Sequence, residues 1–430
     1  MSEALRIGLA GLGTVGGGVV DILDRHKDLL AARCGRPLVL AGVSARTKTR
    51  ERNLPLGKVK WFDNPVKMAS DPGIDVVVEA IGGEEGIAKR IAETALKAGK
   101  HLVTANKAMI AHQGTRLAKL AEKNGVALRF EAAVAGGVPI IKALREGLAA
   151  NRLVEVYGIL NGTCNYILTQ MEDTERDFDE VLAEAQALGF AEADPSFDID
   201  GIDTAHKLAI LASVAFGVEV NFAGIHIEGL RRISSEDITY ARELGYRIKL
   251  LGITRRGALG IEQRVHPCMV EIGSPVAHVE GVFNAIVAEG DAVEHAVFEG
   301  PGAGRGPTAS AIVADIIDIA RGDLSPAFSV PARMLKRSVP YPMAERRGAN
   351  YVRLRVVDEP GVIARVAAAL RDADVSIESI IQRGRAEGDL VSMVMVTHEV
   401  REGSMVQALG RIGRLKTVVE PPTMIRIVTF

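Results

Sequence analysis

The chain has 430 residues, of which 47% are apolar and 25% charged, and its 52 Lys and Arg against 54 Asp and Glu leave a net charge of -2. This length is too great for one hydrophobic core, and the composition is that of an ordinary folded protein, so we expect three domains. The balanced charge gives no electrostatic reason to bind nucleic acid or an anionic membrane surface, which leaves a small molecule as the expected partner.

Residues 1–130 alternate strand-like and helix-like segments, the pattern of a doubly wound parallel sheet of the Rossmann type. The first strand is followed directly by GLGTVG, in which Gly11, Gly13 and Gly16 form the G-x-G-x-x-G of dinucleotide-binding proteins. These glycines permit a tight turn, a close approach of the backbone to a pyrophosphate, and close packing of helix on strand. Further strands are expected at residues 38–45, 75–83, 100–110 and 126–137.

Cofactor choice should be encoded at the end of the second strand, where an acid binds a ribose 2'-hydroxyl and a base accepts a 2'-phosphate. Residues 44–48 (SARTK) contain no acid, and the guanidinium of Arg46 matches a phosphate. We therefore expect NADP rather than NAD. The alternative is that Arg46 and Lys48 belong only to a solvated loop.

An acidic segment, GFAEADPSFDIDGIDTAHK, places five carboxylates ahead of one lysine. A calcium loop does not fit, because DIDGID has its glycine at the fourth position and lacks the closing glutamate. In one interpretation, Asp200 caps a helix that begins near residue 201, and the charges serve helix stability. Asp203 then lies in the first turn and pairs with Lys207 four residues on.

In the second interpretation, the same helix face points into a cleft. Burial lowers the pKa of a lysine, so a desolvated Lys207 can serve as a general acid or base. An ammonium held at a carbonyl oxygen stabilises the alkoxide that forms when the carbon accepts hydride, and it delivers the proton. The surplus carboxylates suit the amine of a cationic substrate, with Glu192 and Asp198 as candidates. Spacing alone does not separate the two interpretations.

Three other side chains each have a functional and a structural interpretation. Cys164 is either a thiol nucleophile, as in aldehyde dehydrogenases that acylate an enzyme cysteine, or a buried structural thiol. Lys107, at the end of TANK, is either a site residue at the ligand edge of the sheet or an exposed loop lysine. His206 is expected on a neighbouring helix face rather than in the chemistry.

Six motifs spread over residues 8–320 resemble homoserine dehydrogenase, which interconverts L-aspartate 4-semialdehyde and L-homoserine with NAD(P). They are GLGTVG, TANK, EAAVAGGVPI, GILNGTCNYIL, GFAEADPSFDIDGIDTAHK and GPGAGRGPTA. The resemblance implies an oxidoreductase of threonine, methionine and isoleucine biosynthesis. It also implies an α+β catalytic and dimerisation domain at residues 131–332, whose last helix is expected to return to the Rossmann domain, and a homodimer or homotetramer.

The resemblance also implies roles for individual residues. The general acid/base of the family corresponds to Lys207. Substrate contacts correspond to Lys107, Thr163, Glu192, Asp198 and Asp203. Cofactor contacts are expected at Gly11, Gly13, Thr14, Val15, Gly16, Thr104, Lys107, Gly189 and Gly304. Arg46, in the loop after the second strand, is a further expected contact. A structural sodium ion is implied, held by the Glu131 carboxylate and the backbone oxygens of Val134, Gly136 and Val138.

Residues 333–349 contain two prolines and many basic residues, and are expected to be a linker. Residues 350–430 follow the order β-α-β-β-α-β, with a turn at DEPGV. This order and this turn resemble the ACT regulatory domain, which implies an amino-acid effector, threonine in this pathway. Backbone amides at the turn can receive an effector carboxylate, with contacts expected at Asp358, Gly361 and Val362. The alternative is a module that only stabilises or dimerises the chain.

Two rival functions remain. One is the acylating dehydrogenase that would use Cys164, and the other is a non-catalytic sensor of a dinucleotide and an amino acid. The three cysteines are far apart and the N-terminus does not resemble a signal peptide, so we expect a cytoplasmic protein. The longest apolar run, which follows Lys207, is too short to span a membrane.

Overall fold

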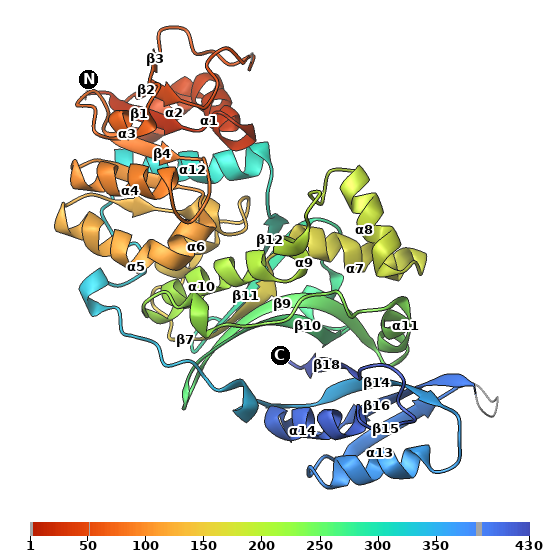
Figure 1. Cartoon of the computed structure of the whole chain (residues 1–430). Coiled ribbons are helices and arrows are strands. Elements are labelled where there is room, and N and C mark those ends of the chain that lie inside the picture. Colours follow the sequence, from red (N-terminus) through yellow and green to blue (C-terminus); the bar gives the residue numbers. More distant parts are fainter. Residues whose placement is uncertain (1–2, 51, 384–388) are drawn as a thin grey trace.

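The computed structural model describes residues 3–50, 52–383 and 389–430. Figure 1 shows three parts in a row, with the N-terminal sheet at the top, a helix-covered sheet in the middle and a smaller α/β unit at the bottom. The fold class expected from the sequence is confirmed, from the parallel N-terminal sheet to the C-terminal β-α-β-β-α-β unit. Within the described ranges, no helix is long and apolar enough to cross a membrane.

The N-terminal domain is a six-stranded parallel sheet in the order β3-β2-β1-β4-β5-β6. Its strands are β1 (Leu5–Ala10), β2 (Leu38–Ser44), β3 (Lys60–Trp61), β4 (Val76–Glu79), β5 (His101–Thr104) and β6 (Leu128–Arg129). The intervening helices are α1 (Thr14–Arg25), α2 (Lys27–Cys34), α3 (Pro65–Ala69), α4 (Ile87–Lys97) and α5 (Lys107–Lys123). The central strands are almost wholly buried and rich in Ile, Leu and Val, as a sheet covered on both faces requires.

Three strands are shorter than the sequence predicted. The run 75–83 is a strand only as far as Glu79, and Gly82 and Gly83, both with φ of 90°, turn the chain just beyond it. The run 100–110 is a strand only over β5, because helix α5 begins at Lys107. The run 126–137 contributes only β6, after which Glu131–Ala133 form a 3-10 turn. All three departures lie at the carboxyl edge of the sheet, where the chain turns away toward the ligand side.

Helix α12 (Arg305–Ala320) comes from a distant part of the sequence and packs on α1 in the N-terminal domain. A side chain at Gly18 would place its Cβ 2.6 Å from the carbonyl oxygen of Arg305, so the missing side chain lets the two helices touch. Ala309 and Ile312 of α12 share a buried cluster with Val19 of α1. The run of glycines after the first strand therefore serves helix packing as well as the turn.

The middle domain has the strands β7 (Leu153–Ile159), β8 (His226–Ile227), β9 (Tyr246–Gly257), β10 (Gly260–Glu271), β11 (Phe283–Gly290) and β12 (Glu294–Pro301). Its helices are α6 (Ile140–Lys142), α7 (Gly162–Thr174), α8 (Phe178–Ala187), α9 (Ser196–Ile199), α10 (Ile202–Phe216) and α11 (Ser235–Glu243). Helix α10 packs on β9 and on α5, and almost all of it is buried. It therefore lies between the N-terminal domain and the middle sheet.

The C-terminal domain contains β13 (Arg347–Gly348), β14 (Asn350–Val357), α13 (Val362–Arg371), β15 (Ile377–Gln382), β16 (Leu390–Thr397), β17 (Val400–Arg401), α14 (Glu402–Ile412) and β18 (Thr423–Val428). Its sheet continues the middle sheet, in the order β12-β11-β7-β9-β10-β18-β14-β16-β15. Strand β18 runs parallel to β10 and antiparallel to β14. Buried Arg426 of β18 pairs with Glu228 of the middle domain at 2.7 Å and with Glu402 of α14 at 2.5 Å.

The segment expected to be a linker, residues 333–349, lies along the middle domain. Ile261 donates to the carbonyl oxygen of Val339 at 2.9 Å, and Tyr341 donates back to Ile261 at 3.0 Å. Ser338 and Arg346 are buried. The middle and C-terminal domains are thus joined by the sheet and by this bound segment.

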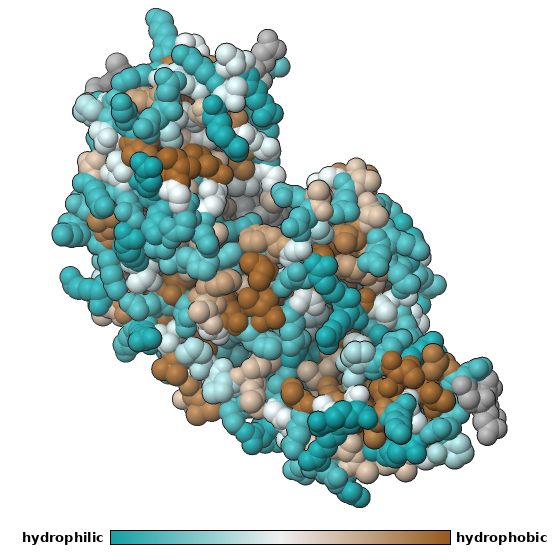
Figure 2. Space-filling model, viewed as in Figure 1, coloured by the Kyte–Doolittle hydropathy of each residue, from teal (hydrophilic) through white to brown (hydrophobic). Residues whose placement is uncertain are grey.

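Figure 2 shows hydrophilic side chains over most of one face of the molecule, with apolar groups in the centre and at the lower right, over the C-terminal domain. The exposed apolar side chains of that domain include Ile380 on β15 and Leu390 on β16, which are 40% and 50% exposed. Among the described residues, strand β15 ends the sheet and pairs only with β16. An apolar surface beside an open strand edge favours association with another chain.

Candidate active site

A cavity of about 660 Å³ opens between the N-terminal and middle domains. Its walls come from the start of α5, the start of α7, α9, the first turns of α10, β11 and the loop before α12. Eight of the residues predicted from the sequence line it together, namely Lys107, Thr163, Gly189, Glu192, Asp198, Asp203, Lys207 and Gly304. Residues far apart in the sequence are therefore brought to one site.

Asp203 lies at the centre of the polar groups in this cavity. Its Oδ1 atom is 2.5 Å from Nζ of Lys107, and its Oδ2 atom accepts from Nζ of Lys207 at 2.7 Å. Asn161 donates to the same Oδ2 at 2.8 Å. Because Asp203 is 2% exposed and both oxygens are engaged by protein groups, it positions the two lysines.

The two lysines differ in environment. Burial lowers the pKa of Lys207 below its usual value, although Asp203 acts against it, and the ammonium of Lys107 lowers it further. Burial also acts to lower the pKa of Lys107, but Asp203 outweighs it and that pKa is raised. The charges of the two lysines likewise hold the pKa of Asp203 well below its usual range, against the effect of burial. Lys207 is thus the more ready proton donor of the two.

The ammonium of Lys207 is held by two hydrogen bonds. It donates to the carbonyl oxygen of Leu160 at 2.6 Å and to Asp203 at 2.7 Å. An ammonium has three N–H donors, so one remains for a ligand in the cavity that Lys207 lines. The fixed geometry is what a positioned proton donor requires.

The remaining carboxylates separate into two groups. Asp198 lines the cavity, accepts from Asn161 at 2.8 Å, and has a pKa raised by burial and then by the charge of Asp203. Glu192 lines the same cavity and is exposed. Asp200 points away and pairs with Arg231 at 2.5 Å. The prediction that Asp200 caps helix α10 is wrong, because Gly201 takes the cap position with φ of 83° and no side-chain cap is present.

The prediction for Asp203 in the first turn of α10 agrees with the structure, and so does its pairing with Lys207. One arrangement therefore satisfies both interpretations of the acidic segment, because the charge pair that stabilises the helix also lies on the face that lines the cavity. The hydroxyl of Thr163 donates to the carbonyl oxygen of Phe190 at 2.9 Å at the cavity wall. Lys107 also lies 5.5 Å from the ring centre of Phe197, which gives the cavity an aromatic wall.

The predicted dinucleotide contacts lie mainly at the carboxyl edge of the N-terminal sheet. Gly13 is the N-cap of α1, and the first turn, which holds Thr14, Val15 and Gly16, contains no acidic residue. The N–H groups and the dipole of this helix end are therefore available to a phosphate. Gly11 precedes the helix, with φ of 103°.

Arg46 and Thr104, two further residues predicted to contact the cofactor, differ in their exposure to solvent. Arg46 lies exposed directly after β2, as the loop argument requires. The hydroxyl of Thr104 donates to buried Glu79 at 2.6 Å and accepts from the backbone N–H of Asn106 at 3.0 Å. The side chain of Thr104 is thus occupied within the protein, which leaves its backbone for a cofactor.

Cys164 does not have the surroundings of a nucleophile. It is fully buried, and its thiol lies 3.2 Å from the carbonyl oxygen of Asp198, to which it donates. Burial, and then the charge of Asp198, raise the pKa of the thiol well above its usual value. A reactive cysteine needs the opposite shift, so the structural interpretation of Cys164 is the better one.

Sequence reasoning missed two asparagines of this cavity. Asn161 caps α7 by accepting from the backbone N–H of Cys164 at 2.8 Å, and its amide donates to Asp198 and Asp203. An asparagine before a helix is a recognised cap signal, which would have placed it at this turn. Asn284 of β11 is 1% exposed, lines the cavity, and has no hydrogen-bond partner for its amide in the described part of the chain. No local sequence pattern marks Asn284.

Glu131 lies outside the cavity and is 2% exposed. Its carboxylate accepts from the backbone N–H groups of Ile141 and Lys142 at 2.9 and 2.8 Å. Burial, and then the charge of Asp315, raise its pKa to about 8. A cation beside this carboxylate would offset both effects, so the residues present fit the predicted ion.

The three residues predicted for an effector lie together in the C-terminal domain. Asp358, Gly361 and Val362 line a cavity of about 790 Å³ between the end of β14 and the start of α13. Gly361 is the N-cap of α13, with φ of 88°. The amides of this helix end are therefore placed to receive a carboxylate.

Family models match the chain over most of its length: the NAD-binding domain of homoserine dehydrogenase over residues 11–131, homoserine dehydrogenase over 139–317 and the ACT domain over 350–416. A homoserine dehydrogenase of Neisseria gonorrhoeae is 44% identical over 432 residues, with 99% of each chain covered. A solved homoserine dehydrogenase of Thiobacillus denitrificans has a TM-score of 0.94 and 43% identity, over 99% of this chain and 98% of that chain. A hyperthermophilic archaeal homoserine dehydrogenase in complex with NADPH has a TM-score of 0.63 and 27% identity, over 74% of this chain and 97% of that chain.

Proposed function

The chain belongs to the homoserine dehydrogenase family and is an NAD(P)-dependent oxidoreductase, and from this premise we propose which residues carry the reaction. Its substrates are L-aspartate 4-semialdehyde and L-homoserine, in amino-acid biosynthesis. The rival functions, an acylating dehydrogenase and a non-catalytic sensor, are set aside by this membership and by Cys164, which is buried and whose thiol pKa is raised by burial. The observation that carries the proposal is the ammonium of Lys207, which is buried, doubly held and faces the cavity.

The nicotinamide supplies or takes the hydride at the substrate carbon. In the direction of reduction, Lys207 donates its third N–H to the carbonyl oxygen and gives that oxygen its proton, so that the alcohol leaves neutral. Asp203 keeps Lys207 and Lys107 charged and in place. Asp198 and Glu192 receive the substrate ammonium, since Asp203 is already engaged by both lysines. In the direction of oxidation, Lys207 takes the proton back.

The reaction itself is the first test. The purified chain should reduce NADP when L-homoserine is added, and should oxidise NADPH when the semialdehyde is added, in an absorbance assay. The same assay with NAD measures cofactor preference, and added threonine measures feedback. A protein with intact fold by circular dichroism that turns over neither cofactor would contradict the proposed function.

NADP is the preferred cofactor in this proposal. Its support is Arg46 at the end of β2, without an acid in residues 44–48, and the NADPH described for the archaeal relative. Replacing Arg46 with alanine should raise KM for NADP by about 10- to 100-fold, because a charge-assisted hydrogen bond is worth about 1.5–3 kcal/mol. KM for NAD should change little, since NAD lacks the 2'-phosphate. An equal change in both values would assign Arg46 to the loop alone.

A structural sodium ion is proposed at Glu131 and the backbone oxygens of Val134, Gly136 and Val138. Within the described ranges, no hydrogen bond is donated to the carbonyl oxygens of Val134 and Gly136, which leaves them for a ligand. The buried carboxylate supplies the charge. Hard cations take such oxygen ligands.

Removing sodium gives a measurable result. Exchanging NaCl for choline chloride at equal ionic strength should lower the thermal midpoint, because an ion at about 100 times its Kd stabilises the fold by about 2.7 kcal/mol. The Glu131→Gln variant should start from a lower midpoint and show no sodium dependence. Glu180→Gln, at an exposed glutamate of α8, serves as the control. A thermal midpoint of the wild type that is the same with and without sodium would contradict the proposed ion.

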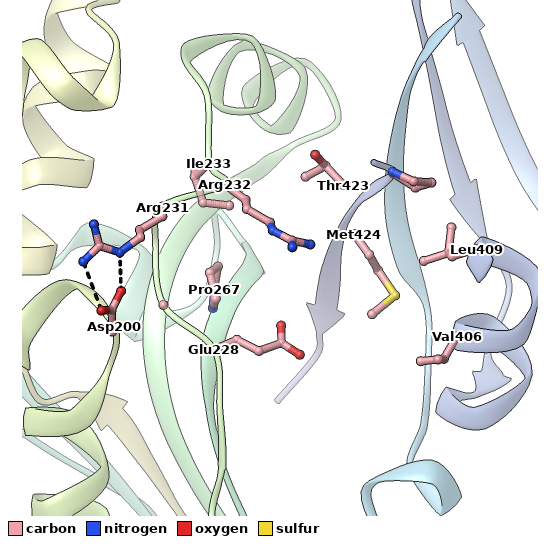
Figure 3. A pocket seen from close by; sticks show the side chains of 12 residues that line it. Asp200, Glu228, Arg231, Arg232, Ile233, Pro267, Val406, Leu409, Thr423 and Met424 are labelled. Carbon is pink, nitrogen blue, oxygen red and sulfur yellow. Dashed lines mark hydrogen bonds and ion pairs between the residues drawn. The ribbon is translucent and has the colours of Figure 1, made fainter. Parts of the chain in front are cut away.

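Threonine is proposed as the effector, bound at the turn of Asp358, Gly361 and Val362. A route toward the active site lies at the boundary of the C-terminal domain, along a third cleft of about 520 Å³, whose lining side chains are drawn in Figure 3. Beside it, Arg231 binds Asp200 and the hydroxyl of Ser196 at 3.1 Å. Ser196 begins α9, which carries Asp198 into the active cavity.

Glu228 lies in the same segment as Arg231, between β8 and α11, and it pairs with Arg426 of β18. The boundary therefore extends to the C-terminal sheet. A shift of the C-terminal sheet therefore reaches α9 through charged contacts. Allostery in this proposal is the coupling between threonine binding and the position of α9. A homodimer or homotetramer is proposed, with residues 131–332 as the dimerisation domain and the exposed apolar residues at the β15 edge as a further contact surface. A cytosolic location remains a prediction.

A further inference from the structure

We propose that Glu84, His112 and His206 form a binding site for a divalent transition metal such as Zn²⁺, beside the active cavity and separate from the sodium site. The Nε2 atom of His112 lies 3.1 Å from Nε2 of His206 and 3.0 Å from Oε2 of Glu84. One ligand atom from each residue lies within 4.8 Å of the other two. None of the three has a role in the hydride and proton transfers described above.

The three residues come from both sides of the domain boundary. Glu84 lies in the loop between β4 and α4, and His112 lies in α5, so both belong to the N-terminal domain. His206 lies in α10 of the middle domain, next to Lys207. Helices α5 and α10 are also the two that bring Lys107 and Asp203 together. A metal at this cluster would therefore tie the two domains at the level of the active cavity.

Protons alone account poorly for this geometry. The Nε2 atom of His112 carries at most one hydrogen, yet it faces both an imidazole nitrogen and a carboxylate oxygen. If that hydrogen points to Glu84, the Nε2 atom of His206 can form only a weak, shared hydrogen bond with it. If His112 instead accepts from His206, its lone pair faces the oxygen of Glu84. A metal ion between the three would accept a lone pair from each of them.

The chemistry of the donor set points to a first-row metal. Two imidazoles and one carboxylate bind zinc and its neighbours, with open positions left for water. Nitrogens about 2.0–2.1 Å from one zinc ion lie about 3 Å apart when the angle between them is near 100°, which matches the observed contact. Burial, and then His112, lower the pKa of His206 to about 4, so its ring is neutral and ready to bind metal near pH 7.

The surroundings set the expected strength. The ring of Phe222 stacks on His206 at 4.6 Å between centres, and Phe197 lies at 5.5 Å, so apolar groups cover this ligand. The Nδ1 atom of His206 has no hydrogen-bond partner in the described part of the chain, so no hydrogen bond at the far side of the ring supports it as a ligand. The side chain of Glu84 is 54% exposed, so its carboxylate is also in contact with water. We therefore expect micromolar affinity rather than the tight binding of a closed structural zinc site.

The test is a titration of the untagged, full-length chain with Co²⁺, followed by visible absorption. The wild type should develop bands stronger than those of Co²⁺ in water, and Zn²⁺ should remove them by competition. His112→Ala and Glu84→Gln should each weaken binding by at least about 10-fold. His278→Ala, at an exposed histidine elsewhere, is the matched control and should bind like the wild type. Unchanged binding in His112→Ala, or no bands in the wild type, would overturn the site.

The tie between the domains has its own readout. Zn²⁺ should lower the turnover of the wild type, because substrate exchange at a domain boundary needs the two sides to separate. A chelator should restore it, and the turnover of His112→Ala should not respond to Zn²⁺. Full wild-type turnover with Zn²⁺ bound, as monitored by competition with Co²⁺, would refute the tie. Because metal binding is read by absorption, failure of the proposed reaction would not be mistaken for failure of this site.

Discussion

Replacing Lys207 with alanine is expected to lower turnover by about 10³-fold or more while leaving NADPH binding almost unchanged. The loss combines the proton donor, worth about 10²–10⁴-fold, with the charge that stabilises the developing alkoxide. NADPH binding should persist, because the first turn of α1 and Arg46 lie outside the cavity that Lys207 lines. Single-turnover absorbance measures the chemistry, and fluorescence titration measures the binding.

Two further variants sharpen this result. Lys207→Met keeps most of the aliphatic stem and should be as inactive as alanine, with better retained stability. Lys207→Arg keeps the charge, yet a guanidinium does not give up its proton near neutral pH, so little activity should return. Turnover near the wild-type value in any of the three would remove Lys207 from the proton transfer.

The second large effect is expected for Asp203→Asn. The variant leaves buried Lys207 and partly exposed Lys107 without their shared carboxylate, and breaking a buried ion pair such as Asp203–Lys207 costs about 3–5 kcal/mol. Unfolding by urea should show a midpoint well below that of the wild type. Turnover should also fall, by about 100-fold, because neither lysine keeps its position.

The pH profile of this variant gives a separate signature. In the direction of reduction, activity needs protonated Lys207, so the rate falls as pH rises through the pKa of that lysine. Asp203 raises this pKa, and its removal lowers it further below the usual value. The fall in rate should therefore move to lower pH in Asp203→Asn. Glu192→Gln, at an exposed acid of the same cavity, should weaken substrate binding without moving the profile.

The sequence supported the overall fold well because its signals are local. The G-x-G-x-x-G after β1 and the β-α-β-β-α-β order near the C-terminus each lie within a short stretch, and the structure contains both. The pairing of Asp203 with Lys207 was predictable for the same reason, because four residues on a helix span one turn. The function was predictable from the motifs that carry the family resemblance, and the family match confirms it.

Long-range contacts were not predictable in this way. Asn284 reaches the cavity through the pairing of β11 with β7, and nothing near it in the sequence reveals that position. The local pattern predicts a helix cap at Asp200, whereas its carboxylate pairs with Arg231, which is distant in the sequence. The contact of His112 with His206 likewise joins two helices from different domains. Each of these depends on tertiary packing, which a local pattern does not encode.

The position of β18 within the large sheet bears on how the molecule is made. This strand is synthesised after every other strand that the structure describes, yet it lies between β10 and β14 rather than at an edge. Until it docks, two strands of a nearly finished protein have open edges, and open edges recruit neighbouring chains. Completion of the sheet is therefore a late step of folding. A nascent or shortened chain that lacks residues 423–428 is therefore expected to aggregate more readily than the complete chain.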